Sequence, residues 1–126
     1  MDERKRHEAG TKVRRAVLGD AHVDRAKEHE NSFNADFQDL ISRYAWGEVW
    51  TRPGLPRSTR SLLTVAMLVA LNRMDELKMH LRGALKNGAT REELKEVLLQ
   101  CAIYCGVPAA NSAFHVAEEV LGPFKK

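Results

Sequence analysis

The stretch SLLTVAMLVALN, residues 61–72, constrains the fold of this chain more than any other feature. Its apolar residues fall on almost every side of a helix, which is typical of a helix at the centre of a protein. The segments on either side also carry apolar residues at helical spacings, and no segment alternates apolar and polar residues as a strand does. The sequence therefore predicts an all-α protein, a bundle of about six or seven helices.

Capping signals mark several of the expected helix ends. Ser58 or Thr59 can cap the central helix, and the Asn-Gly pair at 87–88 ends the helix after it. In the motif TREE, Thr90 and Glu93 form a capping box at the start of the next helix. The other segments expected to be helical are residues 2–18, 33–46, 74–86, 90–105 and 109–121, with residues 21–31 ambiguous.

Length and composition predict one domain. The chain has 126 residues, of which 44% are apolar, enough for one hydrophobic core. We expect a single domain over residues 1–126, in which residues 1–31 form peripheral N-terminal helices and residues 33–122 form the core bundle. The first helix is polar, and such a helix often gains its stability by docking elsewhere, for instance on another subunit.

Charge and hydropathy exclude several classes of function. The net charge is +3, and the basic residues between Lys5 and Arg15 are interleaved with acidic ones, which favours a solvated face over a nucleic-acid patch. No apolar run approaches the roughly 20 residues of a membrane span. The charged start has no apolar segment of a secretory signal, and two cysteines are not a disulfide framework. We expect a cytoplasmic protein with no nucleic-acid or membrane partner.

The stretch WGEVWTRPGLPRSTR, residues 46–60, is expected to be the longest non-helical segment, because glycines and prolines punctuate it. Its two tryptophans need a place to bury themselves, and loops on a helical scaffold often carry function. Arg52, Arg57 and Arg60 belong to this stretch. They are either ordinary surface arginines or groups that bind a carboxylate-bearing ligand.

Cys101 and Cys105 are four residues apart on one predicted helix. This spacing separates their Cβ atoms by roughly 5–6 Å, whereas a disulfide requires about 3.8 Å. They lie near the helix C-terminus, where the helix dipole disfavours a thiolate. Zinc would need about two further ligands, and only His115 could approach. The spacing favours two small core residues, with Cys105 alternatively forming part of a pocket wall.

Arg73, Glu76 and His80 fall on one face of the predicted helix RMDELKMHLRGAL. Glu76 and His80 are four residues apart, so the carboxylate can orient the imidazole and raise its basicity. The alternative is a solvated pair on a surface helix. Spacing alone leaves both interpretations open.

Three stretches resemble the gamma-carboxymuconolactone decarboxylase family: residues 46–73, ELKMHLRGALKNGATREELKEVLLQ and AIYCGVPAANSAFHVAEEVL. The similarity extends to VRRAVLGDAHVDRA near the N-terminus and so covers nearly the whole chain. Relatives of this family include small peroxidase-type proteins with an alkylhydroperoxidase-like helical fold. Their C-x-x-C-x-x-x-H motif falls on this helix, where His80 matches the histidine but Arg73 and Glu76 replace the cysteines. Their upstream glutamate falls near Ser61, so the resemblance argues against thiol redox chemistry.

The resemblance implies a reaction, the decarboxylation of 4-carboxymuconolactone to 4-oxoadipate enol-lactone in the protocatechuate branch of the beta-ketoadipate pathway. This lactone dicarboxylate is its own electron sink, so neither a cofactor nor a metal is expected. We expect His80 to donate a proton or stabilise the oxyanion, with Glu76 orienting it. The expected substrate-binding residues are Trp46, Glu48, Arg52 and Arg60.

The family resemblance also implies assembly, as a trimer or a hexamer of the same chain. Two other classes of function remain open from the sequence. One is a thiol-dependent peroxidase or disulfide reductase of the same fold. The other is a non-catalytic helical binding module whose basic N-terminus contacts acidic partners.

Overall fold

Helices account for all the regular structure in residues 2–126, the part of the chain that the computed structural model describes, and no strand occurs there. The all-α prediction is therefore confirmed. The chain divides into two units, one ending at Leu55 and one beginning at Pro56. The elements are α1 (Glu3–Leu18), α2 (Asp20–Glu28), α3 (Ala35–Ile41), the π-helix η1 (Ser42–Val49), α4 (Arg57–Ala70), α5 (Met74–Lys86), α6 (Arg91–Tyr104) and α7 (Val107–Leu121). None of these helices has the length and apolar character needed to cross a bilayer.

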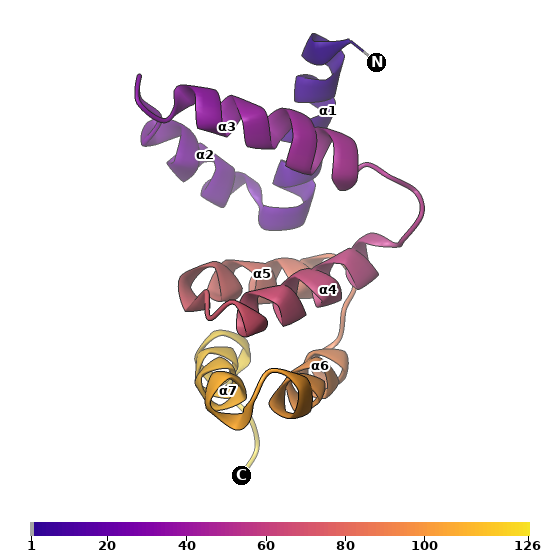
Figure 1. Cartoon of the computed structure of the whole chain (residues 1–126), viewed down its shortest axis with the longest axis vertical. Coiled ribbons are helices and arrows are strands. Elements are labelled where there is room, and N and C mark those ends of the chain that lie inside the picture. The colour runs from indigo at the N-terminus through magenta and orange to yellow at the C-terminus, as the bar shows by residue number, and fades with distance from the viewer. Residues whose placement is uncertain (1) are drawn as a thin grey trace. The chain divides into compact units, whose positions relative to one another are not determined.

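The first unit is organised by the crossing of α1 with the continuous ribbon of α3 and η1 (Figure 1). Two glycines permit a close approach at this crossing. A Cβ atom on Gly10 would overlap the carbonyl oxygen of Ser42, and one on Gly47 would overlap the carbonyl oxygen of Arg6. Val13 and Trp46 contribute to the small core beside the crossing. The glycines thus bring the backbones of α1 and η1 into direct contact.

The expectation that residues 46–60 are non-helical is wrong at both ends of that stretch, because η1 extends to Val49 and α4 begins at Arg57. Residues 42–49 form η1, and the amide of Trp50 donates to the carbonyl of Ala45 at 3.0 Å. Gly47 does not break the helix because its missing side chain is what the packing against α1 requires. The helix expected over residues 33–46 therefore begins later, with α3 at Ala35, and continues through η1 to Val49.

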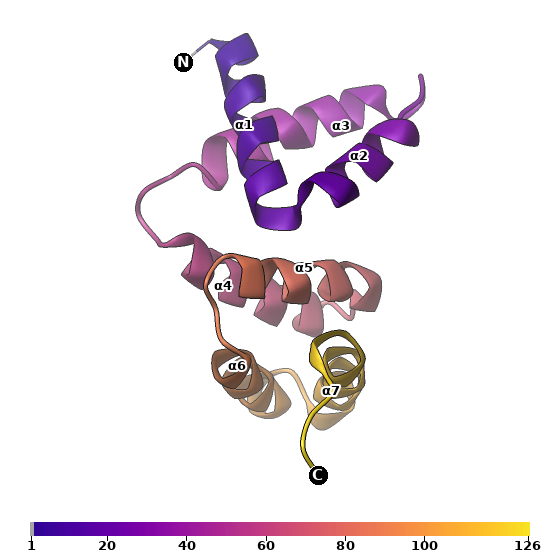
Figure 2. The same cartoon turned by 180° about the vertical axis from the view of Figure 1, so that it is seen from behind.

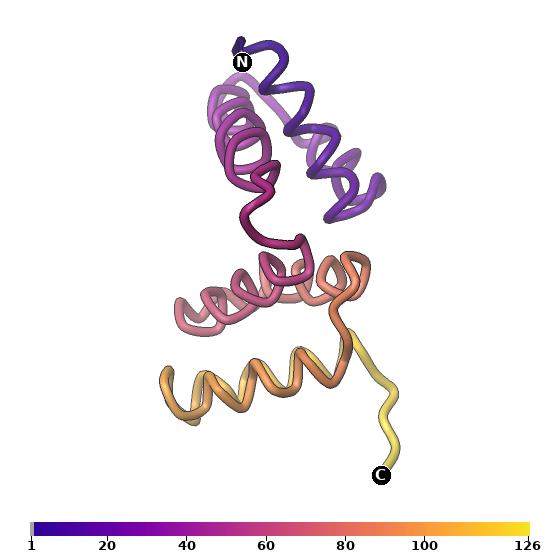
Figure 3. The backbone as a smooth tube through the Cα atoms, turned by 90° about the vertical axis from the view of Figure 1, so that its right-hand side faces the viewer, coloured from indigo at the N-terminus to yellow at the C-terminus, as the bar shows by residue number. Residues whose placement is uncertain are grey.

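The second unit packs α4 against α5 and α6 against α7, as the view from behind shows (Figure 2). The tube view shows α6 and α7 running alongside one another (Figure 3). The core of the second unit includes Ala113 of α7 and larger, fully buried aliphatic side chains of α4, α5 and α6, namely Val65, Val69, Leu77, Leu81, Leu94 and Leu98. This core fixes the inward face of α5 and so determines where the other faces of that helix point.

Helix α4 has one buried face and one exposed face in the second unit. Val65 and Val69 of α4 are fully buried, as predicted for a central helix. Leu63, Met67 and Leu71 lie on the opposite side, and Met67 is 59% exposed. The expected central helix thus contributes one face to the core, and its other face carries an exposed apolar strip of Leu63, Met67 and Leu71.

Of the three helix ends for which the sequence predicts a capping signal, two are correct and one is wrong. Thr90 and Glu93 form the reciprocal capping box, with N–O distances of 2.9 and 3.0 Å. Helix α5 ends at Lys86, before Gly88 at φ 95°. Neither Ser58 nor Thr59 caps α4, because the helix begins one residue after Pro56, whose carbonyl already accepts the amide of Arg60.

Candidate active site

Helix α5 presents Arg73, Glu76 and His80 in the order that the sequence predicts. Arg73 is the N-cap residue, and its Nη2 atom donates to Oε1 of Glu76 at 2.6 Å. His80 lies one turn further along and is half-buried, with its Nδ1 atom shielded from solvent. The two residues next to this face, Leu77 and Leu81, are fully buried and hold the helix in place.

The charges on this face favour an ionised Glu76. The hydrogen bond from Arg73 holds the pKa of Glu76 below its ordinary value, and a backbone hydrogen bond and the charge of His80 act in the same direction. The same contact raises the pKa of Arg73. A carboxylate held ionised one turn from an imidazole can stabilise a protonated ring, the form that donates a proton.

Arg60 and Ser61 lie near the start of the neighbouring helix α4. Arg60 is half-buried, its Nε atom is shielded from solvent, and its carbonyl accepts the hydroxyl of Thr64 at 2.8 Å. Ser61 is fully buried and accepts a hydrogen bond from Nδ2 of Asn87 at 3.3 Å. The position matching the peroxidase glutamate thus holds a neutral hydroxyl paired with an amide.

The first unit brings Trp46, Glu48 and Arg52 together around η1. Trp46 is buried and stacks on Trp50, with ring centroids 5.0 Å apart. Glu48 is exposed and lies between two arginines: its Oε2 atom accepts from Nη1 of Arg6, and its Oε1 atom lies 3.8 Å from Nη1 of Arg52. The three predicted residues of this unit therefore share one short segment, in which two cations balance the carboxylate.

Arg6 is the residue of this cluster that the sequence does not single out. Glu48 follows it by 42 residues, and the surrounding charged residues of α1 read as a solvated face. The only available signal is Gly10 one turn later, because a glycine inside a polar helix indicates close packing. That signal predicts a helix contact without identifying the partner.

Comparisons with known proteins show which family the chain belongs to. The sequence model of the carboxymuconolactone decarboxylase family matches residues 35–119. The chain belongs to this family. It is 58% identical over 120 residues to 4-carboxymuconolactone decarboxylase of Acinetobacter baylyi, covering 95% of this chain and 90% of that protein. It is 41% identical over 118 residues to nitrosuccinic acid decarboxylase npaB of Metarhizium robertsii, covering 94% and 82%.

The two thiols of this carboxymuconolactone decarboxylase family member occupy different environments. Cys101 is buried in the core, and burial is the main cause that raises the pKa of its thiol. Cys105 is exposed at the end of α6, so the prediction of two core residues holds only for Cys101. Cys101, not Cys105, lines a shallow groove of about 360 Å³ between α4 and α6. No disulfide joins the two cysteines, and a buried thiol with a raised pKa is a poor nucleophile.

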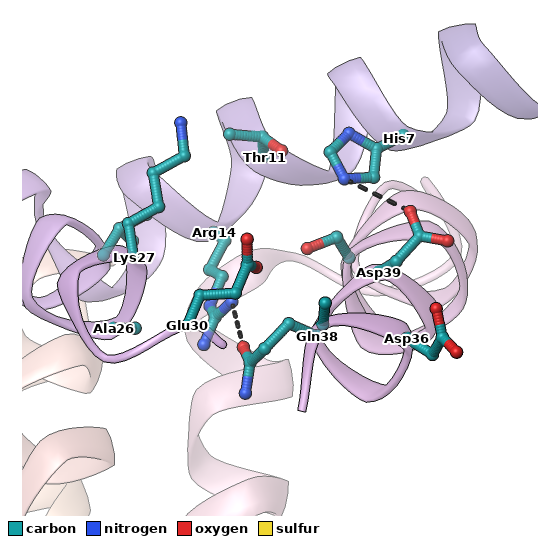
Figure 4. Close-up of a pocket in the computed structure, with 12 residues that line it drawn as sticks. His7, Thr11, Arg14, Ala26, Lys27, Glu30, Asp36, Gln38 and Asp39 are labelled. Carbon is teal, nitrogen blue, oxygen red and sulfur yellow. Dashed lines mark hydrogen bonds and ion pairs between the residues drawn. The ribbon is translucent and has the colours of Figure 1, made fainter. Parts of the chain in front are cut away.

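A separate cavity of about 360 Å³ lies in the first unit of this family member, between α1, α2 and α3 (Figure 4). His7 lies beside Asp39 at 3.5 Å, and Arg14 donates to Gln38 at 3.3 Å. Burial lowers the pKa of Arg14. Other charged residues at the cavity are Lys27, Glu30 and Asp36. Carboxylates line this cavity together with the cations, so the cavity does not favour a dianionic ligand. None of the predicted site residues lines it.

The residues that the structure describes form no candidate metal site. Among residues 2–126, no three His, Cys, Asp or Glu side chains gather closely enough to hold a metal ion. The approach of His115 to the cysteines therefore does not produce a ligand set within these residues.

Proposed function

We propose that this chain decarboxylates 4-carboxymuconolactone to 4-oxoadipate enol-lactone and CO2, in the protocatechuate branch of the beta-ketoadipate pathway of aromatic degradation. The observation that carries the proposal is the 58% identity to the Acinetobacter baylyi enzyme over 95% of this chain. The ionised Glu76 beside His80 supports it, because the reaction needs a group that delivers a proton.

The chemistry follows from the substrate. The bond between the γ-carbon and its carboxylate breaks, and CO2 leaves. The electron pair moves through the ring double bond to the lactone carbonyl, which becomes an enolate oxygen. A proton then adds to the α-carbon, and the carbonyl re-forms in the enol-lactone. The protein needs to stabilise the enolate oxygen, supply the proton and hold two carboxylates.

We assign the catalytic roles to α5. His80 donates the proton or stabilises the enolate oxygen, and Glu76 stabilises the protonated ring. Arg73 supports this role by keeping Glu76 ionised. No step requires a cofactor or a metal, because the substrate accepts its own electrons.

We assign substrate binding to Arg52 and Arg60, whose guanidinium groups suit carboxylates, and to Trp46 and Glu48. A carboxylate such as Glu48 could promote loss of CO2 by opposing the substrate charge. The contacts of Glu48 with Arg6 and Arg52 argue against that effect, because two cations offset its charge. Orientation of Arg52 is the role that these contacts support.

We also propose that the chain forms a single domain over residues 1–126 and acts in the cytoplasm, without nucleic-acid or membrane partners. We further propose that it assembles as a homo-oligomer, a trimer or a hexamer. The apolar strip of Leu63, Met67 and Leu71 on α4 supports assembly. Exposed apolar side chains gathered on one helix face favour a protein partner over solvent.

The test is incubation of the purified, chelator-treated protein with 4-carboxymuconolactone and no added cofactor. Loss of substrate absorbance with release of one CO2 per substrate is expected. A parallel incubation with nitrosuccinate tests whether this chain also accepts the substrate named for its 41% identical relative. A protein that leaves 4-carboxymuconolactone unchanged but reduces peroxide with a dithiol would instead support the peroxidase alternative.

A further inference from the structure

Arg6, Glu48 and Arg52 form a line of three charges in the first unit. Glu48 uses one oxygen for each arginine, Oε2 for Arg6 and Oε1 for Arg52 at 3.8 Å. Two of the three are proposed substrate-binding residues, whereas Arg6 comes from α1, outside residues 35–119, which the family model matches. Arg6 therefore contacts a proposed substrate-binding residue without itself being one.

The side chain of Arg6 is held in place from several directions. It is only 17% exposed, its Nε lies 3.5 Å from Oε1 of Glu3, and its guanidinium lies 5.6 Å from the ring centre of Tyr44. The close crossing of α1 with η1 places the Arg6 carbonyl against Gly47, the residue before Glu48. A guanidinium so enclosed loses little further freedom when it binds a carboxylate.

The side chains of Glu48 and Arg52 are more exposed, at 47% and 64%. Exposed side chains sample several rotamers, and an ion pair between them is weak unless one of them is anchored. Arg6 supplies that anchor. With Oε2 engaged by Arg6, Glu48 offers only its second oxygen to Arg52.

We propose that Arg6 is a positioning residue for the decarboxylation: it engages one oxygen of Glu48, so that Glu48 orients Arg52 toward a substrate carboxylate with its other oxygen alone. Without Arg6, both oxygens of Glu48 turn to Arg52 and form the bidentate pair that arginine and carboxylate favour. Arg52 is then occupied by the protein's own carboxylate and competes poorly for that of the substrate. The inference rests on the proposed function and adds the N-terminal helix to it.

Arg6 also ties α1 to η1, so a variant must separate positioning from stability. Arg43 provides the matched control. It links η1 to α1 through Glu3 at 3.0 Å, contacts Asp39 of α3 at 2.9 Å, and also lies over the ring of Tyr44. The contacts of Arg43 with carboxylates are to Glu3 and Asp39, not to Glu48. Arg43→Gln therefore removes a comparable tie and leaves the Arg6–Glu48–Arg52 line intact.

The experiment compares the steady-state kinetics of Arg6→Gln, Arg6→Lys and Arg43→Gln, with thermal unfolding of each. Arg6→Gln is expected to raise KM about tenfold with kcat little changed, because one charge-assisted contact in the bound state is lost. Arg43→Gln is expected to keep the unmutated KM, and Arg6→Lys to recover part of the loss. Equal KM values for Arg6→Gln and Arg43→Gln would overturn the inference. If Arg6→Gln does not fold, Arg6→Lys decides: a KM equal to that of the unmutated protein overturns it.

A double variant tests the route through Glu48. Adding Glu48→Gln to Arg6→Gln removes the carboxylate that would capture Arg52, so KM is expected to fall part of the way back from the Arg6→Gln value. The rest of the increase remains, because Glu48 no longer orients Arg52. A KM that rises further, as the product of the two single effects, would show independent sites and overturn the relay. The unmutated protein separates the two proposals: no turnover there overturns the decarboxylase function itself, whereas normal turnover with an unaffected Arg6→Gln overturns only the role of Arg6.

Discussion

The guanidinium of Arg73 donates to the carboxylate of Glu76 at 2.6 Å, at the first turn of α5. The residues that take these two positions in the peroxidase-type relatives are expected to be cysteines, so an ion pair stands where a thiol pair would act. The ion pair leaves the helix with a charged carboxylate one turn before His80. The same backbone positions are thereby suited to proton transfer rather than to electron transfer.

The Arg73–Glu76 contact predicts a pH dependence. Arg73 lowers the pKa of Glu76. The contact therefore contributes its full stabilisation of the folded state above the ordinary pKa of a glutamate, and this stabilisation is lost as the pH falls through the lowered pKa of Glu76. In Arg73→Gln the pKa of Glu76 rises towards its ordinary value. If Glu76 acts ionised, the acidic limb of the kcat profile should move to higher pH. Arg82→Gln, which removes an exposed cation from the same helix, controls for net charge. An acidic limb that stays in place in Arg73→Gln would remove Glu76 from the mechanism.

His80→Ala should lower kcat by roughly 10²–10⁴, the range for loss of a general acid or an oxyanion donor. KM should change little, because the role arises in the transition state. Arg60→Ala should do the opposite, raising KM while kcat holds. His115→Ala, at an exposed histidine on α7, is the matched control and should match the unmutated protein. Normal kinetics in His80→Ala would exclude this residue from the site.

The parts of the structure that the sequence predicts are those determined over a few residues. The capping box of Thr90 and Glu93 and the end of α5 depend on neighbours in the chain, and both are as expected. The order of Arg73, Glu76 and His80 on one helix face likewise follows from helical geometry. These features need no knowledge of tertiary packing.

The features that the sequence does not predict depend on distant segments. Gly47 reads as a helix breaker, and only the contact with α1 makes it part of η1. The Arg6–Glu48 pair joins residues 42 positions apart, so no local pattern indicates it. Cys105 is exposed because it is the C-cap residue of α6 and lies beyond the part of that helix that packs into the core. Helix periodicity specifies a face without specifying what covers it.

Replacement of both cysteines should leave substantial turnover. Cys101→Ser should lower the free energy of unfolding, because a hydroxyl enters an apolar core in place of a buried thiol. Cys105→Ser should change stability by no more than about 0.5 kcal/mol, as is usual at exposed positions. Chemical denaturation and steady-state kinetics of the single and double variants measure both effects. A thousandfold loss of turnover with the helical circular dichroism spectrum intact would contradict a passive role for the thiols.

The apolar strip on α4 predicts the assembly state. Met67→Lys places a charge in the middle of this strip, and burying an unpaired ammonium in an interface is strongly unfavourable. Light scattering should report a trimer or a hexamer for the unmutated chain and a smaller mass for Met67→Lys. Asn111→Lys, at an exposed polar position on α7, should leave the mass unchanged. A monomer at micromolar concentration in the unmutated chain would show that the proposed assembly is wrong.

Gly10→Ala should destabilise the first unit, because the added methyl group meets the carbonyl oxygen of Ser42, a backbone atom that cannot rotate away. Overpacking of this kind costs about 1–3 kcal/mol and sometimes more. Gly54→Ala is the matched control, since nothing lies within 4 Å of a Cβ atom there. Alanine at position 54 should leave the denaturation midpoint nearly unchanged, whereas alanine at position 10 should lower it clearly. Because Gly10 lies one turn after Arg6, separating α1 from η1 should also raise KM in Gly10→Ala. Equal denaturation midpoints for the two variants would mean that α1 does not pack closely on η1, and the route from Arg6 to Arg52 would lose its structural basis.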